Sequence, residues 1–316
     1  MKNENVLEKI GKNKSKIRIR HFAKVSDLTK EEIENLIERG LVIKKTNFRS
    51  NLLKGKNIAL MFEKPSTRTR VAFEVAINHL GGSPIYLDHV TTQLTRGEPM
   101  KDFIRVMNRY VDALIVRMYK HSDLDELIRY SEIPIINGLT DLEHPCQALS
   151  DLMTLKEFNY LDSSKTLAFY GDANFNVANS LLYAVSLFKL KIKIVSPKKY
   201  ASNEEYLKLI KKNTKVEIIE DPIEGAKDVD IFYTDTWISM GIEHEKADRI
   251  RELMQYQLSD TILSNANSNA IVMHCLPAYR NFEITDSVIE KFSKIIFTQS
   301  ENKLHMHKAL LEFLIK

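Results

Sequence analysis

The segment 63–70 of the 316-residue chain, Glu-Lys-Pro-Ser-Thr-Arg-Thr-Arg, contains the residue types that could bind a phosphate dianion. It lies between a short apolar run over 57–62 and an apolar helical pattern that stops at a pair of glycines. These patterns predict a buried parallel strand followed by a helix that begins near Ser66. Free backbone N–H groups, hydroxyls and the guanidinium of Arg68 would then converge at the end of the strand, which suits an oxyanion. The competing interpretation is a simple helix cap beside two solvated arginines.

Three further polar segments follow predicted strands. The segment 144–147, His-Pro-Cys-Gln, opens a helix, and its His and Gln could both reach a ligand at the helix N-terminus, although a purely structural helix entry is an equal alternative. The segment 274–277, His-Cys-Leu-Pro, ends a buried strand, where a cysteine is usually a packing residue. The segment 235–241, Asp-Thr-Trp-Ile-Ser-Met-Gly, could in isolation be a turn capped by its Asp.

A metal site is disfavoured by the spacing of the candidate ligands. A zinc site would have to combine His144, Cys146, His274 and Cys275. These positions match no usual zinc-binding pattern, so we expect no metal.

Strand and helix patterns alternate along most of the chain, which predicts two α/β domains, each with a mostly parallel sheet flanked by helices. A capping box over 29–32 opens a first helix that extends to about residue 45. Further helices are predicted over 100–110, 122–131 and 145–158, between the later strands, and from about residue 300 onward. Strands are predicted over 57–62, 85–87, 113–118, 134–136, 167–170, 192–195, 216–219, 231–234, 270–274 and 295–297.

The polar segment 159–165 is the predicted boundary between the domains. We therefore expect a basic N-terminal extension over 1–20, a first domain over 21–160 and a second over 161–316, with the C-terminal helix packed back on the first. In parallel sheets, ligands bind beyond the carboxyl ends of the strands. Because the polar segments fall at such ends in both domains, the sequence predicts one active site in the cleft between them.

Composition argues against several functional classes. The net charge is +4, and most Lys and Arg residues are interleaved with Glu and Asp, which indicates solvated faces and not a nucleic-acid-binding surface. No stretch of about 18 apolar residues occurs, so no membrane span is expected. The two cysteines favour a reducing compartment over a disulfide framework, and we expect a cytoplasmic protein.

Taken together, these segments resemble the carbamoyltransferase family, and within it the branch that uses ornithine. The segments with the order and spacing of the family's motifs are 66–70, 93–99, 137–141, 144–147, 235–241, 274–277 and 301–305. The resemblance extends over about residues 20 to 316. It implies transfer of the carbamoyl group of carbamoyl phosphate to the δ-amine of L-ornithine, which gives L-citrulline and phosphate in arginine metabolism. It also implies a homotrimer or a multiple of trimers, and no metal, nucleotide or flavin cofactor.

The resemblance implies roles for individual side chains, carried over by position. The phosphate group would be bound by Ser66, Thr67, Arg68 and Thr69, with Gln93 supplied by a neighbouring subunit. The carbamoyl group would meet Arg117, His144 and Gln147, and the reacting centre would face Cys275 and the carbonyl of Leu276. The amino-acid end of ornithine would be held by Asn176, Asp235, Ser239 and the backbone of Met240.

These residue types fit the chemistry of the implied reaction. The δ-amine has a lysine-like pKa of about 10.4, so it must lose a proton before it attacks the carbamoyl carbon. Cys275 with Asp235 is the candidate proton relay. Attack creates an oxyanion, which Arg117, His144 and Thr69 could stabilise.

Two positions depart from the family's usual residues. Lys303 stands where the family has an arginine that contacts carbamoyl phosphate, and a lysine supplies a point charge but no forked contact. Phe175 replaces the first residue of an Asn–Asn pair, which leaves Asn176 to act alone.

Two alternative functions are weighed against this interpretation. A putrescine-using sister enzyme would share the carbamoyl phosphate site, but the 235–241 loop argues against it, because putrescine has no amino-acid end to bind. From another class, a catalytically inactive anion sensor is disfavoured, because the chain carries a full reactive set: Arg68, His144, Asp235 and Cys275.

Overall fold

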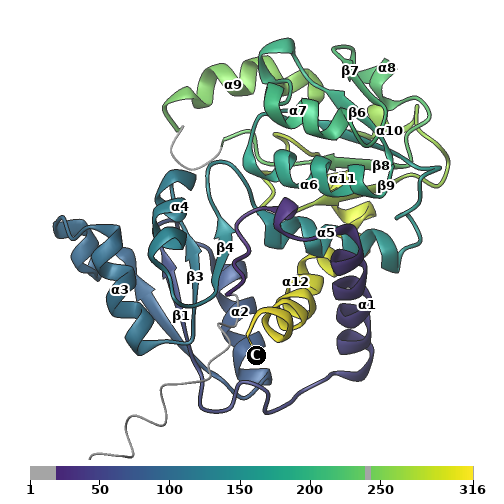
Figure 1. Cartoon of the computed structure of the whole chain (residues 1–316). Coiled ribbons are helices and arrows are strands. Elements are labelled where there is room, and N and C mark those ends of the chain that lie inside the picture. The colour runs from purple at the N-terminus through teal and green to yellow at the C-terminus, as the bar shows by residue number, and fades with distance from the viewer. Residues whose placement is uncertain (1–18, 239–242, 316) are drawn as a thin grey trace, which may run out of the picture.

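The computed structural model describes residues 19–238 and 243–315, so the basic N-terminal segment is represented only by residues 19 and 20. The chain forms two α/β halves, each built on a sheet whose strand pairs are all parallel (Figure 1). The predicted fold class is therefore confirmed.

The first sheet has the strand order β2-β1-β3-β4, and helices cover both of its faces. Every residue of the two inner strands is buried except the first of β1, as expected for a parallel sheet between two layers of helices. Thr29 caps α1 through the predicted capping box with Glu32. The strands are β1 Asn57–Phe62, β2 Ser83–Asp88, β3 Ala113–Arg117 and β4 Ile135–Leu139, and the helices are α1 Lys30–Thr46, α2 Thr67–His79, α3 Met100–Tyr110, α4 His121–Tyr130 and α5 Pro145–Glu157.

The second sheet has the order β7-β6-β5-β8-β9. Its strands are β5 Thr166–Tyr170, β6 Lys191–Val195, β7 Val216–Ile219, β8 Ile231–Thr234 and β9 Ile271–His274. The helices that follow are α6 Asn176–Leu187, α7 Glu204–Lys211, α8 Pro222–Ala226, α9 Lys246–Leu253, α10 Asp260–Leu263, α11 Asp286–Lys291 and α12 Ser293–Leu314. Short 3-10 turns lie at η1 Val25–Asp27, η2 His89–Thr91, η3 Gln93–Arg96, η4 Lys198–Tyr200, η5 Glu243–Glu245 and η6 Met254–Tyr256.

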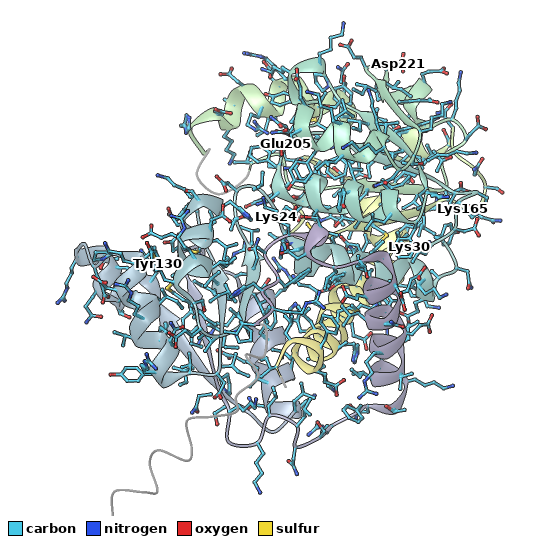
Figure 2. All side chains as sticks on the ribbon, in the orientation of Figure 1. Lys24, Lys30, Tyr130, Lys165, Glu205 and Asp221 are labelled. Atoms are coloured by element: carbon cyan, nitrogen blue, oxygen red, sulfur yellow. The ribbon has the colours of Figure 1, made fainter. Side chains whose placement is uncertain are left out.

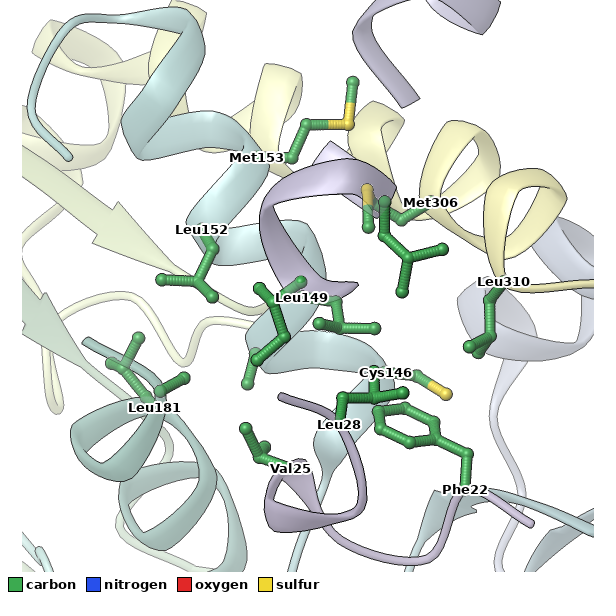
Figure 3. Close-up of a cluster of buried hydrophobic side chains, with 14 of the residues drawn as sticks. Phe22, Val25, Leu28, Cys146, Leu149, Leu152, Met153, Leu181, Met306 and Leu310 are labelled. Atoms are coloured by element: carbon green, nitrogen blue, oxygen red, sulfur yellow. The ribbon is translucent and has the colours of Figure 1, made fainter. Parts of the chain in front are cut away.

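A shared hydrophobic core joins the two halves. Helix α12 packs against α1, α2 and α5, and α5 also packs against α6 of the second half. Figure 3 shows Leu149 and Leu152 of α5 in one apolar cluster with Met306 and Leu310 of α12. Full burial of a leucine-sized side chain stabilises a fold by roughly 1.5–3 kcal/mol. The C-terminal helix is therefore an integral part of the first half, although the chain reaches it last.

The predicted strand over 295–297 is wrong, because these residues belong to α12, which begins at Ser293 and not near residue 300. Three apolar residues in a row fit a buried strand and a helix equally well. The spacing of the buried residues over a longer segment identifies a helix, because they recur every three or four positions: Ile296, Gln299, Lys303, Met306 and Leu310. Phe297, which a central strand would bury, is 55% exposed.

Charged side chains cover the outside of the molecule, with acids and bases interspersed (Figure 2). Glu205 and Asp221 are exposed on the second half, where Lys165 also pairs with Asp230 at 3.1 Å. None of the helices in the described ranges combines the length and the apolar character that a bilayer crossing requires.

Candidate active site

A cavity of about 300 Å³ lies where the carboxyl ends of the two sheets meet. The cavity lies next to the point in each sheet where the direction of strand addition reverses, which is between β1 and β3 in the first sheet and between β5 and β8 in the second. Parallel sheets bind ligands at such points. The cavity is lined by most of the residues predicted from the sequence: Ser66, Thr67, Arg68, Thr69, Arg117, His144, Gln147, Asn176, Asp235, Cys275, Leu276 and Lys303.

Hydrogen-bond donors gather at the N-terminus of α2. Ser66 caps the helix, since its Oγ accepts the N–H of Thr69 at 3.4 Å. Lys303 reaches the same place from α12, and its Nζ donates to Thr69 Oγ1 at 3.3 Å. Arg68 lines the same wall. A helix N-terminus combined with a guanidinium and an ammonium group forms a strongly anion-attracting site.

Arg117, at the end of β3, and His144, directly before α5, occupy the middle of the cavity. Burial lowers the pKa of Arg117 to about 10, so the guanidinium remains charged at neutral pH. Burial, reinforced by the positive charge of Lys303, holds the pKa of His144 well below its ordinary value, so the imidazole is neutral. Within the described part of the chain, Arg117 Nε and His144 Nδ1 are buried without a hydrogen-bond partner, and both are available to a polar ligand.

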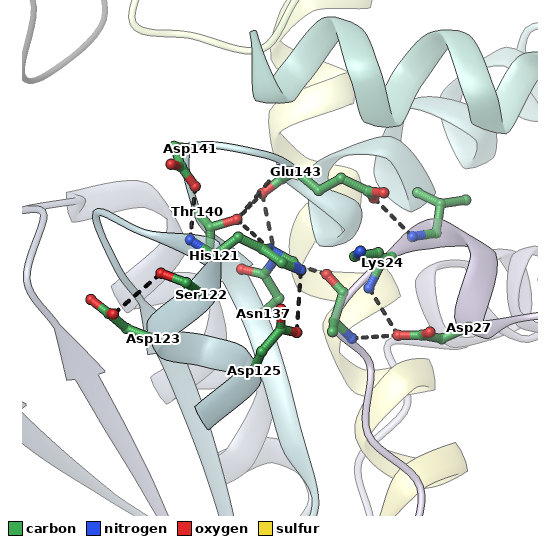
Figure 4. A network of polar contacts seen from close by, with 12 residues as sticks. Lys24, Asp27, His121, Ser122, Asp123, Asp125, Asn137, Thr140, Asp141 and Glu143 are labelled. Atoms are coloured by element: carbon green, nitrogen blue, oxygen red, sulfur yellow. Dashed lines mark hydrogen bonds and ion pairs between the residues drawn. The ribbon is translucent and has the colours of Figure 1, made fainter. Parts of the chain in front are cut away.

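The buried carboxylate of Glu143 anchors the peptide that carries His144 (Figure 4). It accepts hydrogen bonds from the backbone N–H of Val25 at 2.9 Å, the hydroxyl of Ser180 at 3.2 Å and the phenol of Tyr206 at 2.6 Å. The N–H of His144 itself donates to Ser180 Oγ at 2.8 Å. These partners come from η1, α6 and α7, so His144 is held at the junction of the two halves.

Cys275, which is buried, and Asp235, which is half-buried, form a pair that lines the cavity. They directly follow β9 and β8, which are neighbouring parallel strands. The thiol of Cys275 donates to Asp235 Oδ1 at 3.0 Å. Burial, and then the negative charge of Asp235, hold the pKa of the Cys275 thiol well above its ordinary value, while burial also raises the pKa of Asp235. The thiol is therefore the hydrogen-bond donor, and the carboxylate is the basic member of the pair.

Leu276 adopts a left-handed backbone conformation, with φ of 57°. The neighbouring His274 stabilises it, since His274 Nδ1 accepts the N–H of Leu276 at 2.9 Å. Because Nδ1 is an acceptor, Nε2 carries the hydrogen and donates to Glu283 Oε1 at 3.1 Å. Because this conformation is disfavoured for leucine, the hydrogen bond to buried His274 is needed to hold Leu276 at the cavity wall.

The start of α6 supplies Asn176, whose amide nitrogen donates to the carbonyl of Thr140. Phe175, the residue that departs from the family pattern, precedes it as the helix N-cap. The guanidinium of Arg249 lies 5.2 Å from the Phe175 ring and forms a buried ion pair with Asp172. The aromatic replacement is thus accommodated against a cation.

Among the described residues, one predicted site residue does not line the cavity. Gln93 lies exposed in η3. Ser239 and Met240 lie outside the described residues.

Sequence reasoning missed a polar network buried behind the cavity. Asp151 of α5 accepts hydrogen bonds from Gln147 Nε2 at 2.8 Å, from Gln299 Nε2 at 2.7 Å and from the Tyr233 hydroxyl at 3.0 Å. The signal that could have indicated it is an acid one helical turn after Gln147, on the same face of the helix.

Both halves of the chain match family models. Residues 20–157 match the model described as aspartate/ornithine carbamoyltransferase, carbamoyl-P binding domain. Residues 163–314 match the model described as aspartate/ornithine carbamoyltransferase, Asp/Orn binding domain.

Similar proteins with established names cover nearly the whole chain. The ornithine carbamoyltransferase of Archaeoglobus fulgidus is 43% identical over 297 residues, which are 93% of this chain and 96% of the relative. The structure of the Pyrococcus furiosus ornithine carbamoyltransferase superposes with a TM-score of 0.88 at 39% identity, covering 94% of this chain and 97% of that one. The anabolic enzyme of the same name from Campylobacter jejuni gives a TM-score of 0.89 at 41% identity, covering 94% and 99%.

Proposed function

Because the chain belongs to the aspartate/ornithine carbamoyltransferase family, we propose that it transfers the carbamoyl group of carbamoyl phosphate to the δ-amine of L-ornithine, giving L-citrulline and phosphate. The observation that carries the proposal is one cavity that joins the anion-attracting start of α2 to the Cys275–Asp235 pair. The relatives named ornithine carbamoyltransferase support ornithine as the acceptor, since they match more than nine-tenths of the chain.

In this proposal the first half binds carbamoyl phosphate. The start of α2, with Arg68 and the ammonium of Lys303, neutralises the phosphate dianion. Arg117 and neutral His144 point polar atoms at the carbamoyl group, where fixed donors stabilise the oxyanion that attack creates. Gln147 completes this part of the site. The phosphate ligands proposed at the helix start are Ser66, Thr67, Arg68 and Thr69.

The second half binds ornithine. Asn176 and Asp235 reach the cavity from this half, and Ser239 and Met240 follow Asp235 in the chain. Asp235, polarised by the thiol of Cys275, accepts a proton from the δ-ammonium group. The free amine then attacks the carbamoyl carbon and forms the new C–N bond. The C–O bond to phosphate breaks next, and phosphate departs with the electron pair and the remaining amine proton.

We further propose a trimer as the smallest active assembly. Gln93 is exposed and is not among the residues that line the cavity of its own chain, which fits the idea that it completes the phosphate site of a neighbouring subunit. The two buried free cysteines are consistent with action in the reducing cytoplasm.

The decisive experiment measures citrulline formation by the purified protein and compares ornithine with putrescine at saturating carbamoyl phosphate. We expect kcat/KM for ornithine to exceed that for putrescine by at least about 100-fold, since a site built for polar groups rejects a ligand that lacks them. A preference for putrescine would replace the proposed acceptor. Absence of any carbamoylated product, with carbamoyl phosphate still bound, would indicate an anion-binding protein that is not an enzyme.

A further inference from the structure

We propose that Asp151 is a positioning residue that fixes the orientation of the Gln147 amide, so that Gln147 presents its carbonyl oxygen to the cavity and selects ligands that carry an N–H donor. This inference rests on the proposed function, because the donor it concerns is the NH₂ group of carbamoyl phosphate. It adds the reason why the site would distinguish a carbamoyl group from an acyl group of the same shape.

The orientation of the network follows from one group that can only donate. The backbone N–H of His274 lies 3.0 Å from Gln299 Oε1, so this oxygen must face the end of β9. The NH₂ of Gln299 then faces the other way, toward Asp151 Oδ1 at 2.7 Å and the Tyr233 hydroxyl at 3.2 Å. The His274 N–H therefore decides which atom of the Gln299 amide is the oxygen and which is the nitrogen, a choice that side-chain geometry alone leaves open.

Asp151 transmits this orientation to Gln147. An ionised carboxylate accepts hydrogen bonds and cannot donate them. Because Asp151 Oδ1 lies 2.8 Å from the Gln147 amide, the group that faces it must be the NH₂. The carbonyl oxygen of Gln147 is then the end of the amide that Asp151 leaves free, on a residue that lines the cavity.

The freed oxygen has the properties of a recognition group. Gln147 is 1% exposed, and among the described residues its Oε1 has no hydrogen-bond partner. A buried acceptor without a partner destabilises the empty site, and a ligand N–H that pairs with it recovers this energy. A ligand with a methyl group at the same position leaves the oxygen unpaired and is bound more weakly.

A carboxylate suits this role better than any other side chain of its size. Asp151 is fully buried between α5, β8 and α12 and receives three donors, from Gln147, Gln299 and Tyr233. Burial raises the pKa of Asp151 to about 6, and these hydrogen bonds oppose the rise, so the group is mostly ionised at neutral pH. Asn keeps one acceptor oxygen and can retain the Gln147 contact, whereas Leu has no acceptor and the shorter Ser does not reach Gln147.

The test compares two phosphonates by titration calorimetry: phosphonoacetamide, which ends in NH₂, and 2-oxopropylphosphonate, which has a methyl group there. We expect wild type to bind the amide at least about tenfold more tightly than the ketone. Asp151→Leu should reduce this preference to about threefold or less, and Asp151→Asn should restore most of it. Affinity for inorganic phosphate should stay within about twofold in both variants, because the start of α2 is untouched.

Asp151→Ser replaces Asp151→Leu in this test if the leucine variant does not fold, because serine is smaller and its hydroxyl can donate a hydrogen bond to the backbone of its own helix. Thr154→Val is the matched control. It removes a buried hydrogen bond between α5 and α12, from Asn302 Nδ2 to Thr154 Oγ1 at 2.9 Å, without touching Gln147. This variant should keep the wild-type preference for the amide.

Each result decides a separate question. A wild-type protein that forms citrulline but binds both phosphonates equally overturns the recognition role of Gln147 and leaves the proposed function standing, whereas the absence of citrulline contradicts the proposed function itself. A wild-type preference that survives in folded Asp151→Leu or Asp151→Ser overturns the role of Asp151 alone. Equal loss of preference in Thr154→Val also overturns it, because the effect would then reflect general damage to helix packing.

Discussion

Lys303 should make the empty protein less stable than it would be with an apolar residue at that position. Its side chain is 3% exposed, and burial lowers the pKa of its ammonium from 10.5 to about 8. At about 1.4 kcal/mol per pKa unit, this lowering corresponds to a cost of about 3 kcal/mol at neutral pH. Loss of the hydrogen bond to Thr69 would offset about 1 kcal/mol of that. Lys303→Met is therefore expected to raise the free energy of unfolding by about 2 kcal/mol at pH 7.

The pH dependence gives the sharper test. The folded protein releases the Lys303 proton near pH 8, whereas the unfolded chain keeps it to about pH 10.5. Between these values the unfolded state binds more protons, so this lysine makes wild-type stability rise with pH. The advantage of Lys303→Met should be full below pH 8 and should disappear as the pH approaches 10.5. The same variant should lose most of its affinity for carbamoyl phosphate, because a charge at the phosphate site is gone.

The assay is urea denaturation of ligand-free protein at pH 7, 8, 9 and 10, at one protein concentration because assembly contributes to stability. Lys101→Met is the control, since Lys101 is exposed on α3. Its stability relative to wild type should change little over the same range. A Lys303→Met protein that is less stable than wild type at pH 7, or whose difference from wild type is constant with pH, would refute the reasoning.

Three further predictions concern the reaction and the assembly. Arg68→Met should lower kcat/KM for carbamoyl phosphate by at least about 100-fold while the circular dichroism spectrum is unchanged, because a charge at the start of α2 is lost; near-normal kinetics would exclude Arg68 from the phosphate site. Asp235→Asn should lower kcat/KM for ornithine by at least about 100-fold, because the proposed base is lost. Cys275→Ser should lower kcat/KM less and shift its pH profile, because a hydroxyl can still donate to Asp235 but is a stronger donor than a thiol. Superimposable pH profiles for wild type and Cys275→Ser would reduce Cys275 to a packing residue. Mixing Arg68→Met subunits with Gln93→Ala subunits should restore part of the activity, as measured by citrulline formation, if Gln93 serves a neighbouring site; hybrids that form and remain inactive would contradict the shared site.

The sequence was sufficient for features that depend on local chemistry. Apolar runs and helix caps predicted nearly every strand and the start of α1 and α2, because such patterns reflect which face of a short segment is buried. The polar segments at the strand ends, such as 66–69, were likewise expected to meet, since the carboxyl ends of parallel strands share one edge of a sheet. The short run 295–297 failed because its burial depends on where α12 docks and not on its own three residues.

The tertiary structure alone decided which groups face each other and in what state of charge. Asp151 and Gln299 are 148 residues apart in the chain, and no local pattern brings them together. The sequence suggested Cys275 with Asp235 as a proton relay, but only their packing shows that the thiol donates to the carboxylate and that burial holds the pKa of the thiol well above its ordinary value. A side-chain pKa depends on desolvation and on neighbouring charges, and both are fixed only when distant segments pack against one another.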